Sequence, residues 1–173
     1  MLETKPLEQI SIRDIAAVAG VSYTTFFRHH TTKEALLEEI AADQIRRFVE
    51  LGLPNFEANN TRAASLALCT YVNERRKLWS TLLTGGAASA LREEFLRIAE
   101  ELAAERTDPL VLLPPDLVTI LVVSSTIELL TWWLRQEKPF PIERIAEIHD
   151  QQIVTPALRR KKITKKVARI GKK

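Results

Sequence analysis

The chain has little cysteine and no long apolar run, and each shortage excludes a class of protein. One cysteine in 173 residues, Cys69, rules out an internal disulfide framework and fits a reducing compartment. The N-terminal stretch "MLETKPLEQ" is polar and lacks the apolar segment of a signal peptide. The longest nearly apolar run, residues 117–127, is shorter than the ~20 residues of a membrane-spanning helix. We therefore expect a soluble, cytoplasmic protein with no membrane partner.

Signatures of catalysis are also missing. The sequence contains no glycine-rich phosphate loop, no His, Cys and carboxylate cluster at metal-ligand spacing, and no G-x-S-x-G. His29 and His30 are adjacent, so on a helix their side chains would point about 100° apart and would chelate one ion poorly. We expect no enzyme, no cofactor and no bound metal.

The positive charge is concentrated at one end of the chain. The net charge is +3, but nine of the 25 basic residues lie in residues 159–173, which contain no acid. Without them, 16 basic residues face 22 acidic ones. Such a tail is usually a solvated, disordered end, and a contact with nucleic acid is the alternative. We interpret residues 159–173 as a disordered basic tail on a mildly acidic fold.

Helical periodicity is what the sequence does contain. Along residues 33–51 apolar side chains recur every three or four residues, which predicts one buried stripe on a helix. Thr31 and Glu34 predict a capping box at its start, and Gly52 with Pro54 predicts its end. Further stop signals divide the remainder into similar helices, and no alternating strand pattern occurs. We expect an all-α chain of about eight helices.

One short stretch indicates how the chain acts. Residues 11–19 and 23–30 predict two short helices, each preceded by or starting at a serine that can cap it. Gly20 predicts the left-handed residue that ends the first helix. We expect Val21 and Phe26 to fill the angle between the two helices. This is a helix-turn-helix unit, which presents its second helix to the major groove of DNA.

The wider pattern "ISIRDIAAVAGVSYTTFFRHHTTKEALL" resembles the DNA-binding segment of the TetR family of repressors. The segments "LWSTLLTGG" and "LLTWWLRQEKPFPIERIAEI" are similar, more loosely, to the helical C-terminal domain of that family. The resemblance implies a DNA-binding domain with its connecting helix over residues 1–51, and a ligand-binding and dimerisation domain over residues 52–158. It implies a homodimeric repressor that binds a palindromic operator in double-stranded DNA and leaves it when a small-molecule effector binds.

The resemblance assigns DNA contacts to side chains of the two short helices and of the helix that follows. These residues are Arg13, Ser22, Tyr23, Thr24, Thr25, Phe27, His29 and Lys33. Tyr23 and Thr24, at the exposed start of the second helix, would approach base edges or adjacent phosphates, as would Arg13 from the preceding helix.

The remaining positions are assigned to phosphates, with two departures from the family. Thr25, His29 and Lys33 match positions that commonly hold phosphates. Phe27 stands where the family usually has tyrosine, so its ring can contact a thymine methyl but has no hydroxyl to donate. His30 replaces a large apolar residue, and we expect it to pack against the helix that begins at Lys33.

The resemblance also predicts that the DNA-binding domain is incomplete. Family members carry a further helix before the "SIRD" segment, and only ten residues precede Ser11 here, so we expect the first helix to be missing. Residues 1–50 contain six basic and eight acidic residues, a poor balance for electrostatic DNA binding. The alternative function is a helical dimeric interaction protein that has lost DNA binding with its first helix.

Residues 116–136 predict a helix that is apolar on nearly every side, which must be buried against several neighbours. Together with a helix predicted over residues 142–158, it would form half of a four-helix bundle between two subunits. The alternative is the central helix of a monomer. The expected interface residues are Leu117, Leu121, Ile127, Leu130, Ile145 and Ile148.

The expected effector pocket is lined by aromatic, soft and acidic side chains of the C-terminal domain. These are Cys69, Trp79, Leu83, Phe95, Glu128 and Trp132. The alternative for the apolar members is plain core, and for Glu128 a solvated or interfacial carboxylate. We expect the effector to act by tilting the helix at 33–51 about a break at Gly52–Pro54.

Overall fold

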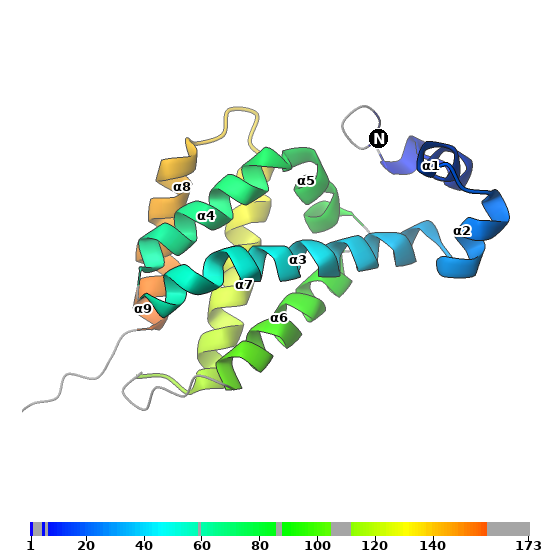
Figure 1. Ribbon diagram of the computed structural model, residues 1–173. Helices are drawn as coiled ribbons and strands as arrows, with labels where there is room; N and C mark the ends of the chain where they lie inside the picture. Colours follow the sequence, from blue (N-terminus) through cyan, green and yellow to red (C-terminus); the bar gives the residue numbers. More distant parts are fainter. Residues whose placement is uncertain (2–4, 6, 59, 86–87, 105–111, 159–173) are drawn as a thin grey trace, which may run out of the picture.

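The structure is a computed structural model that describes residues 1, 5, 7–58, 60–85, 88–104 and 112–158 (Figure 1). A 3₁₀ turn, η1, precedes the first α-helix, and a π-helical turn, η2, precedes the last. The elements are η1 (Leu7–Gln9), α1 (Ile12–Ala19), α2 (Tyr23–His29), α3 (Lys33–Glu57), α4 (Thr61–Glu74), α5 (Arg76–Thr84), α6 (Ala88–Ala104), α7 (Pro115–Leu134), α8 (Ile142–His149), η2 (Asp150–Val154) and α9 (Thr155–Ala157). The described residues contain no strand, which confirms the all-α prediction.

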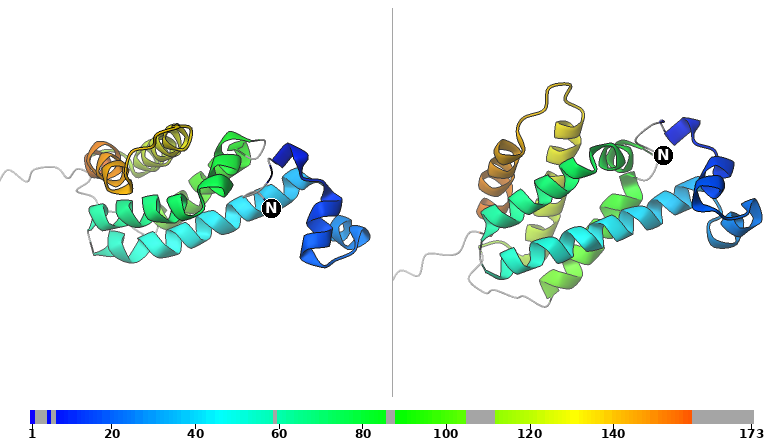
Figure 2. Two further views of the ribbon diagram at one scale, coloured as in Figure 1. Left: turned by 90° about the horizontal axis from the view of Figure 1, so that it is seen from above. Right: turned by 45° about the horizontal axis from the view of Figure 1, so that its top comes forward.

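The helices form a body and a projecting unit. In Figures 1 and 2 the second half of α3 lies in the body, while α1 and α2 lie beyond its N-terminal end. Within the body α3 packs on α4 and α6, α4 packs on α8, and α7 packs on α6 and α5. The projecting α1–α2 unit is therefore carried on the end of a helix whose other end is built into the body.

The predicted end of the connecting helix is wrong, because α3 continues to Glu57. Pro54 lies inside the helix and has no N–H, so the carbonyl of Glu50 loses its usual partner. The lost hydrogen bond costs little here because Pro54 is exposed and lies in the last turn of the helix. The Ala58 N–H donates to the Pro54 carbonyl (3.1 Å) and closes that turn. One helix thus spans the predicted domain boundary at residues 51 and 52.

Helix α3 begins at Lys33 as predicted, but its capping residue differs by one from the prediction. The hydroxyl of Thr32, not that of Thr31, accepts the free N–H of Ala35 at 3.0 Å. Because the helix begins at Lys33, Thr32 is the residue directly before it and Ala35 is the third residue of the helix, so the predicted capping box of Thr31 and Glu34 does not form.

Most other boundaries confirm the sequence signals. Asn60 caps α4 by accepting the Ala63 N–H (3.1 Å), and the chain bends at Arg75 between α4 and α5. Pro115 stands in the first turn of α7. The segment predicted as one helix over residues 142–158 is helical over residues 142–157, with the π-helical turn η2 between α8 and α9. The basic tail, residues 159–173, lies outside the described residues.

Helix α7 corrects the estimate of apolar length. It has 20 residues and a mean hydropathy of 1.8 over its most apolar window, which is long and apolar enough to cross a membrane by length and composition. The sequence estimate stopped where the unbroken apolar run stops, and the helix is longer than the run. In the fold Val123, Leu130 and Trp133 belong to the core, and an internal helix of a soluble protein has the same composition.

A buried histidine joins three helices of the body. His149 of α8 is 3% exposed, its Nδ1 lies 2.8 Å from the hydroxyl of Ser65 in α4, and its Nε2 lies 2.9 Å from the hydroxyl of Thr126 in α7. The Thr126 hydroxyl donates its proton to the Val122 carbonyl (2.7 Å), so it must accept from Nε2–H, and Nδ1 accepts from Ser65. Both ring nitrogens are satisfied in the neutral form, and burial lowers the pKa of His149 to about 4.

The free energy of unfolding should therefore fall as the pH drops from 6.5 towards 4. In the unfolded chain His149 takes up a proton near its ordinary pKa of 6.5, whereas the folded pKa is about 4, so the unfolded state binds more protons in this window. The loss from this residue amounts to about 3 kcal/mol. Urea unfolding at pH 7 and pH 4.5 should show a smaller loss for His149→Gln than for the wild type. The exposed His29→Gln should behave as the wild type, and equal losses in all three proteins would contradict the assignment.

Candidate nucleic-acid interface

Local hydrogen bonds fix the ends of α1. The Ser11 hydroxyl accepts the Asp14 N–H (3.1 Å), and the Asp14 carboxylate accepts the Ser11 N–H (2.9 Å), which completes a capping box. The backbone N–H of Ser11 is the main reason that the pKa of Asp14 lies below its usual value. Gly20 takes the left-handed conformation (φ +68°), and the Val21 N–H returns to the Ala16 carbonyl (3.0 Å). The predicted helix end at Gly20 is confirmed.

Helices α1 and α2 each contribute one buried side chain to the angle between them. Ala16 and Phe26 are buried, with 3% and 5% of their surface exposed. Val21 is 42% exposed, so its predicted role beside Phe26 is wrong.

Three hydroxyls gather at the start of α2. The Ser22 hydroxyl accepts the Thr25 N–H (3.0 Å), as the predicted cap does, and lies 2.8 Å from the Thr24 hydroxyl and 2.7 Å from that of Thr25. Ser22 therefore holds the end of α2 in place. Thr24 remains exposed beside it, while Thr25 is half-buried.

The outer side of the unit carries aromatic rings and positive charge. Tyr23 and Phe27, 48% and 41% exposed, pack edge to face with their ring centroids 4.9 Å apart. The guanidinium carbon of Arg13 lies 5.8 Å from the centroid of the Tyr23 ring. Arg28, exposed and four residues after Thr24, shares that side of α2. We call Arg13, Tyr23, Thr24, Phe27 and Arg28 the recognition face.

Arg28 was missed by the sequence reasoning. The signal was available, since a basic residue one helical turn after Thr24 lies on the same side of the helix. His29, which was predicted, is exposed at the end of α2. His30 lies 3.4 Å from the Glu39 carboxylate and 5.6 Å from the Phe26 ring, so it packs against α3 as expected.

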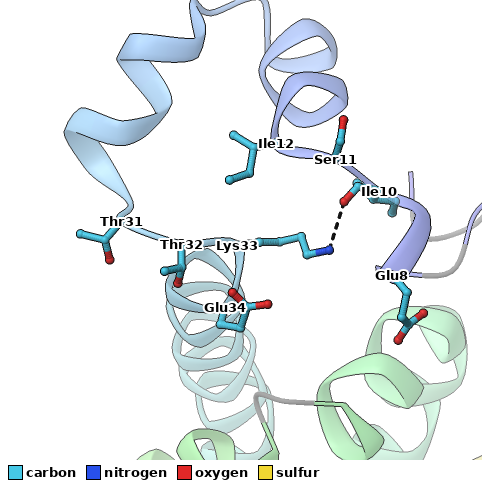
Figure 3. Close-up of a pocket in the computed structure, with 8 residues that line it drawn as sticks. All are labelled: Glu8, Ile10, Ser11, Ile12, Thr31, Thr32, Lys33 and Glu34. Carbon is cyan, nitrogen blue, oxygen red and sulfur yellow. Dashed lines mark hydrogen bonds between the residues drawn. The ribbon is translucent and has the colours of Figure 1, made fainter.

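Lys33 has different partners from those that the sequence suggested. Its ammonium donates to the carbonyls of Leu7 (2.8 Å) and Ile10 (3.1 Å), and so ties the segment before α1 to the start of α3. Figure 3 shows the Lys33 side chain reaching across a cleft of about 440 Å³ towards Ile10. The carboxylates of Glu8 and Glu34 line the same cleft, which disfavours a phosphate there.

The residues predicted for an effector pocket divide into two groups. Cys69, Trp79, Leu83 and Phe95 belong to one buried core contributed by α4, α5 and α6, and burial raises the pKa of the Cys69 thiol to about 12. Trp132 and Glu128 do not join them. Trp132 is 45% exposed and lies against Phe140 (ring centroids 5.9 Å apart), while exposed Glu128 pairs with Arg92 at 3.3 Å. Both residues lie on the outward side of α7.

The residues predicted for the dimer interface also divide into exposed and buried ones. Leu117 and Leu121 are exposed at 39% and 43%, and Ile120, missed by the sequence reasoning, is exposed at 45% between them. We call these three residues the α7 apolar patch. Ile148 is half-buried. Three further predicted residues lie inside the body, at most 7% exposed, and cannot line a surface: Ile127, Leu130 and Ile145.

The N-terminal segment and the fold are similar to those of known proteins. Residues 1–40 match the model of the bacterial regulatory proteins of the tetR family. No curated protein sequence matches the chain significantly. A TetR transcriptional regulator from Streptococcus agalactiae is similar in structure, with a TM-score of 0.58 and 21% identity over 88% of this chain and 86% of that one. The TetR family transcriptional regulator PfmR from Thermus thermophilus has a TM-score of 0.52 and 21% identity, over 88% of this chain and 92% of that one.

Lys33→Met should loosen the segment that precedes α1. The substitution removes both bonds from the ammonium to the Leu7 and Ile10 carbonyls, which should cost about 1–3 kcal/mol locally. Amide hydrogen exchange at Ile10, whose N–H donates to the Leu7 carbonyl (3.1 Å), should become faster. Lys5→Met, at an exposed lysine of the same segment, is the control. Unchanged exchange at Ile10 in Lys33→Met would show that the tie is not needed.

Proposed function

By the sequence of its residues 1–40 and by its fold, the chain belongs to the TetR family, and we propose that it represses transcription. In this proposal a homodimer binds a palindromic operator in double-stranded DNA in the cytoplasm, and a small-molecule effector releases it. The protein acts by binding and not as an enzyme. The recognition face is the observation on which the proposal depends.

The recognition face has the chemistry of a major-groove surface. Tyr23 and Thr24 offer hydroxyls to base edges or phosphates, and Phe27 offers a ring edge to a thymine methyl. Arg13 and Arg28 supply the positive charge that phosphates require. The rings of Tyr23 and Phe27 contact each other on a short helix and still remain 48% and 41% exposed, as expected of a surface that a partner such as DNA covers.

Lys33 takes an indirect part in this proposal. Because its ammonium is bound to two carbonyls, it holds the helix-turn-helix unit at a fixed angle to α3. Thr25, His29 and Ser22 flank the recognition face at the two ends of α2, where the proposal gives Thr25 and His29 phosphate contacts and Ser22 the cap.

The α7 apolar patch supports the homodimer. Three large apolar side chains at intervals of three and one residue lie on one side of α7 and are open to solvent in the single chain. A second copy of the chain would bury them. For adjacent major grooves the separation of the two recognition faces must be about 34–36 Å.

The effector would act through α3. The helix runs unbroken from Lys33 into the core, where Leu37, Ala41 and Ile45 are buried, so a change in packing around these residues moves the α1–α2 unit with it. This replaces the idea of a break at Gly52–Pro54. Ligand and DNA would then oppose each other by one common factor.

DNA binding can be tested on sites selected from a pool of random duplexes. Tyr23→Ala should weaken binding to the selected site by about 1–3 kcal/mol and relax the sequence preference. Phe27→Tyr should strengthen it if that position faces a phosphate. Leu66→Ala, an exposed position on α4, is the control and should bind as the wild type. A wild-type chain that selects no sequence and shifts no duplex at low salt would contradict the proposal and favour the dimeric interaction protein.

The dimer can be tested by light scattering at micromolar concentration. The wild type should have the mass of two chains, and Leu121→Glu should give one chain, because a carboxylate would be desolvated in the interface. Leu66→Glu is the matched control, since Leu66 and Leu121 are exposed to similar extents (41% and 43%). A wild-type mass of one chain would end the homodimer proposal.

A further inference from the structure

Two buried N–H groups of α5 have no hydrogen-bond partner among the described residues. They are Nη1 of Arg76 and Nε1 of Trp79. Each buried donor without a partner costs about 1–3 kcal/mol, and more when the group is charged. Native proteins rarely keep such groups without a reason, and an absent acceptor is a common one.

The guanidinium of Arg76 is held in place without a counter-ion among the described residues. Its Nη2 donates to the Trp133 carbonyl (2.7 Å), and its Cζ lies 5.1 Å from the centroid of the Trp133 ring. Burial lowers the pKa of Arg76, and no carboxylate in the described part of the chain offsets that effect. Its neighbour Arg75, by contrast, pairs with Glu74 at 3.3 Å. The Trp133 carbonyl at the end of α7 explains the position of Nη2, but it leaves Nη1 unexplained.

The indole of Trp79 is in a similar state. Trp79 is 2% exposed and packs edge to face on Tyr71 with ring centroids 6.2 Å apart. In the same core the indole N–H of Trp133 donates to the Phe140 carbonyl (2.9 Å), so the fold can satisfy a buried indole where nothing else is required of it. Arg76 and Trp79 are three residues apart on one helix and therefore neighbours on one side of it.

We propose that Arg76 and Trp79 bind the carboxylate of a small organic acid with an apolar body, and that this acid is the effector of the regulator proposed above. A carboxylate offers two oxygens that can accept from the guanidinium and the indole together. The half-buried Arg76 supplies one positive charge, which matches a carboxylate more closely than a phosphate dianion. Leu82 and Leu83, which follow on α5, are buried in the same core and fit an apolar ligand body.

The place of α5 connects this site to the DNA-binding unit. Figures 1 and 2 show α5 at the end of the body that is nearer to η1. Leu7 of η1 packs against the core to which Trp79 belongs, and the Leu7 carbonyl accepts from Lys33. An acid bound at Arg76 and Trp79 can therefore change the contact that holds the helix-turn-helix unit in position.

The test measures binding by calorimetry without DNA, with sodium benzoate, octanoate and decanoate as probes and decanol as the uncharged counterpart of decanoate. The wild type should bind at least one carboxylate, and decanoate more tightly than decanol. Arg76→Met, which keeps an apolar stem against Trp133, should weaken carboxylate binding about tenfold or more. Trp79→Phe should weaken it several-fold by removing the indole donor, and because it also shrinks a buried ring, its free energy of unfolding is measured beside its affinity. Arg75→Met is the matched control and should bind as the wild type.

Three results would overturn the proposal. They are a wild type that binds none of the three carboxylates, equal binding of decanoate and decanol, and unchanged affinity in Trp79→Phe. The affinity of Trp79→Phe tests the proposal even if Arg76→Met fails to fold. Gel shifts on the selected DNA distinguish this failure from failure of the proposed function. A wild type that binds DNA but no acid contradicts only the acid site. A wild type that binds an acid but no DNA contradicts the proposed regulatory function.

Discussion

The continuity of α3 is the constraint on which the rest of the structure depends. A helix of 25 residues is about 37 Å long and behaves as a stiff rod. Its buried side chains, among them Leu37, Ala41, Ile45 and Phe48, form one stripe that the body encloses. Its first turn carries Lys33, whose two hydrogen bonds hold the segment before α1. The orientation of the recognition face is consequently decided inside the body, at a distance from any DNA.

Local signals in the sequence predicted local structure well. Ser11, Gly20 and Ser22 each act over one helical turn, and each has the predicted role because the groups that it caps are near it in the sequence. The helix-turn-helix unit is made of such signals, so it was predictable without any tertiary information.

What failed depends on contacts between segments that are distant in the sequence. Lys33 has the composition of a phosphate ligand, and only the fold shows that two carbonyls 23 and 26 residues away receive its protons. Helix α7 is apolar on nearly every side, so its sequence does not distinguish Leu121, which is exposed to solvent, from Leu130, which is buried. Pro54 is a helix breaker in general and is tolerated where it stands in a last, exposed turn. In all three cases the role of the residue depends on its position in the fold, which the local sequence does not specify.

The π-helical turn that follows His149 has a consequence for how the C-terminal end of the fold can evolve. In this turn the Thr155 N–H reaches back to the Asp150 carbonyl, five residues earlier, so the chain contains one residue more than an α-helix would need. His149 and Val154 are five residues apart, and both are buried. Because of the additional residue, both His149 and Val154 face the core although five residues separate them. A one-residue deletion here would give a more regular α-helix but a less stable fold, because the side chain of either His149 or Val154 would rotate towards water.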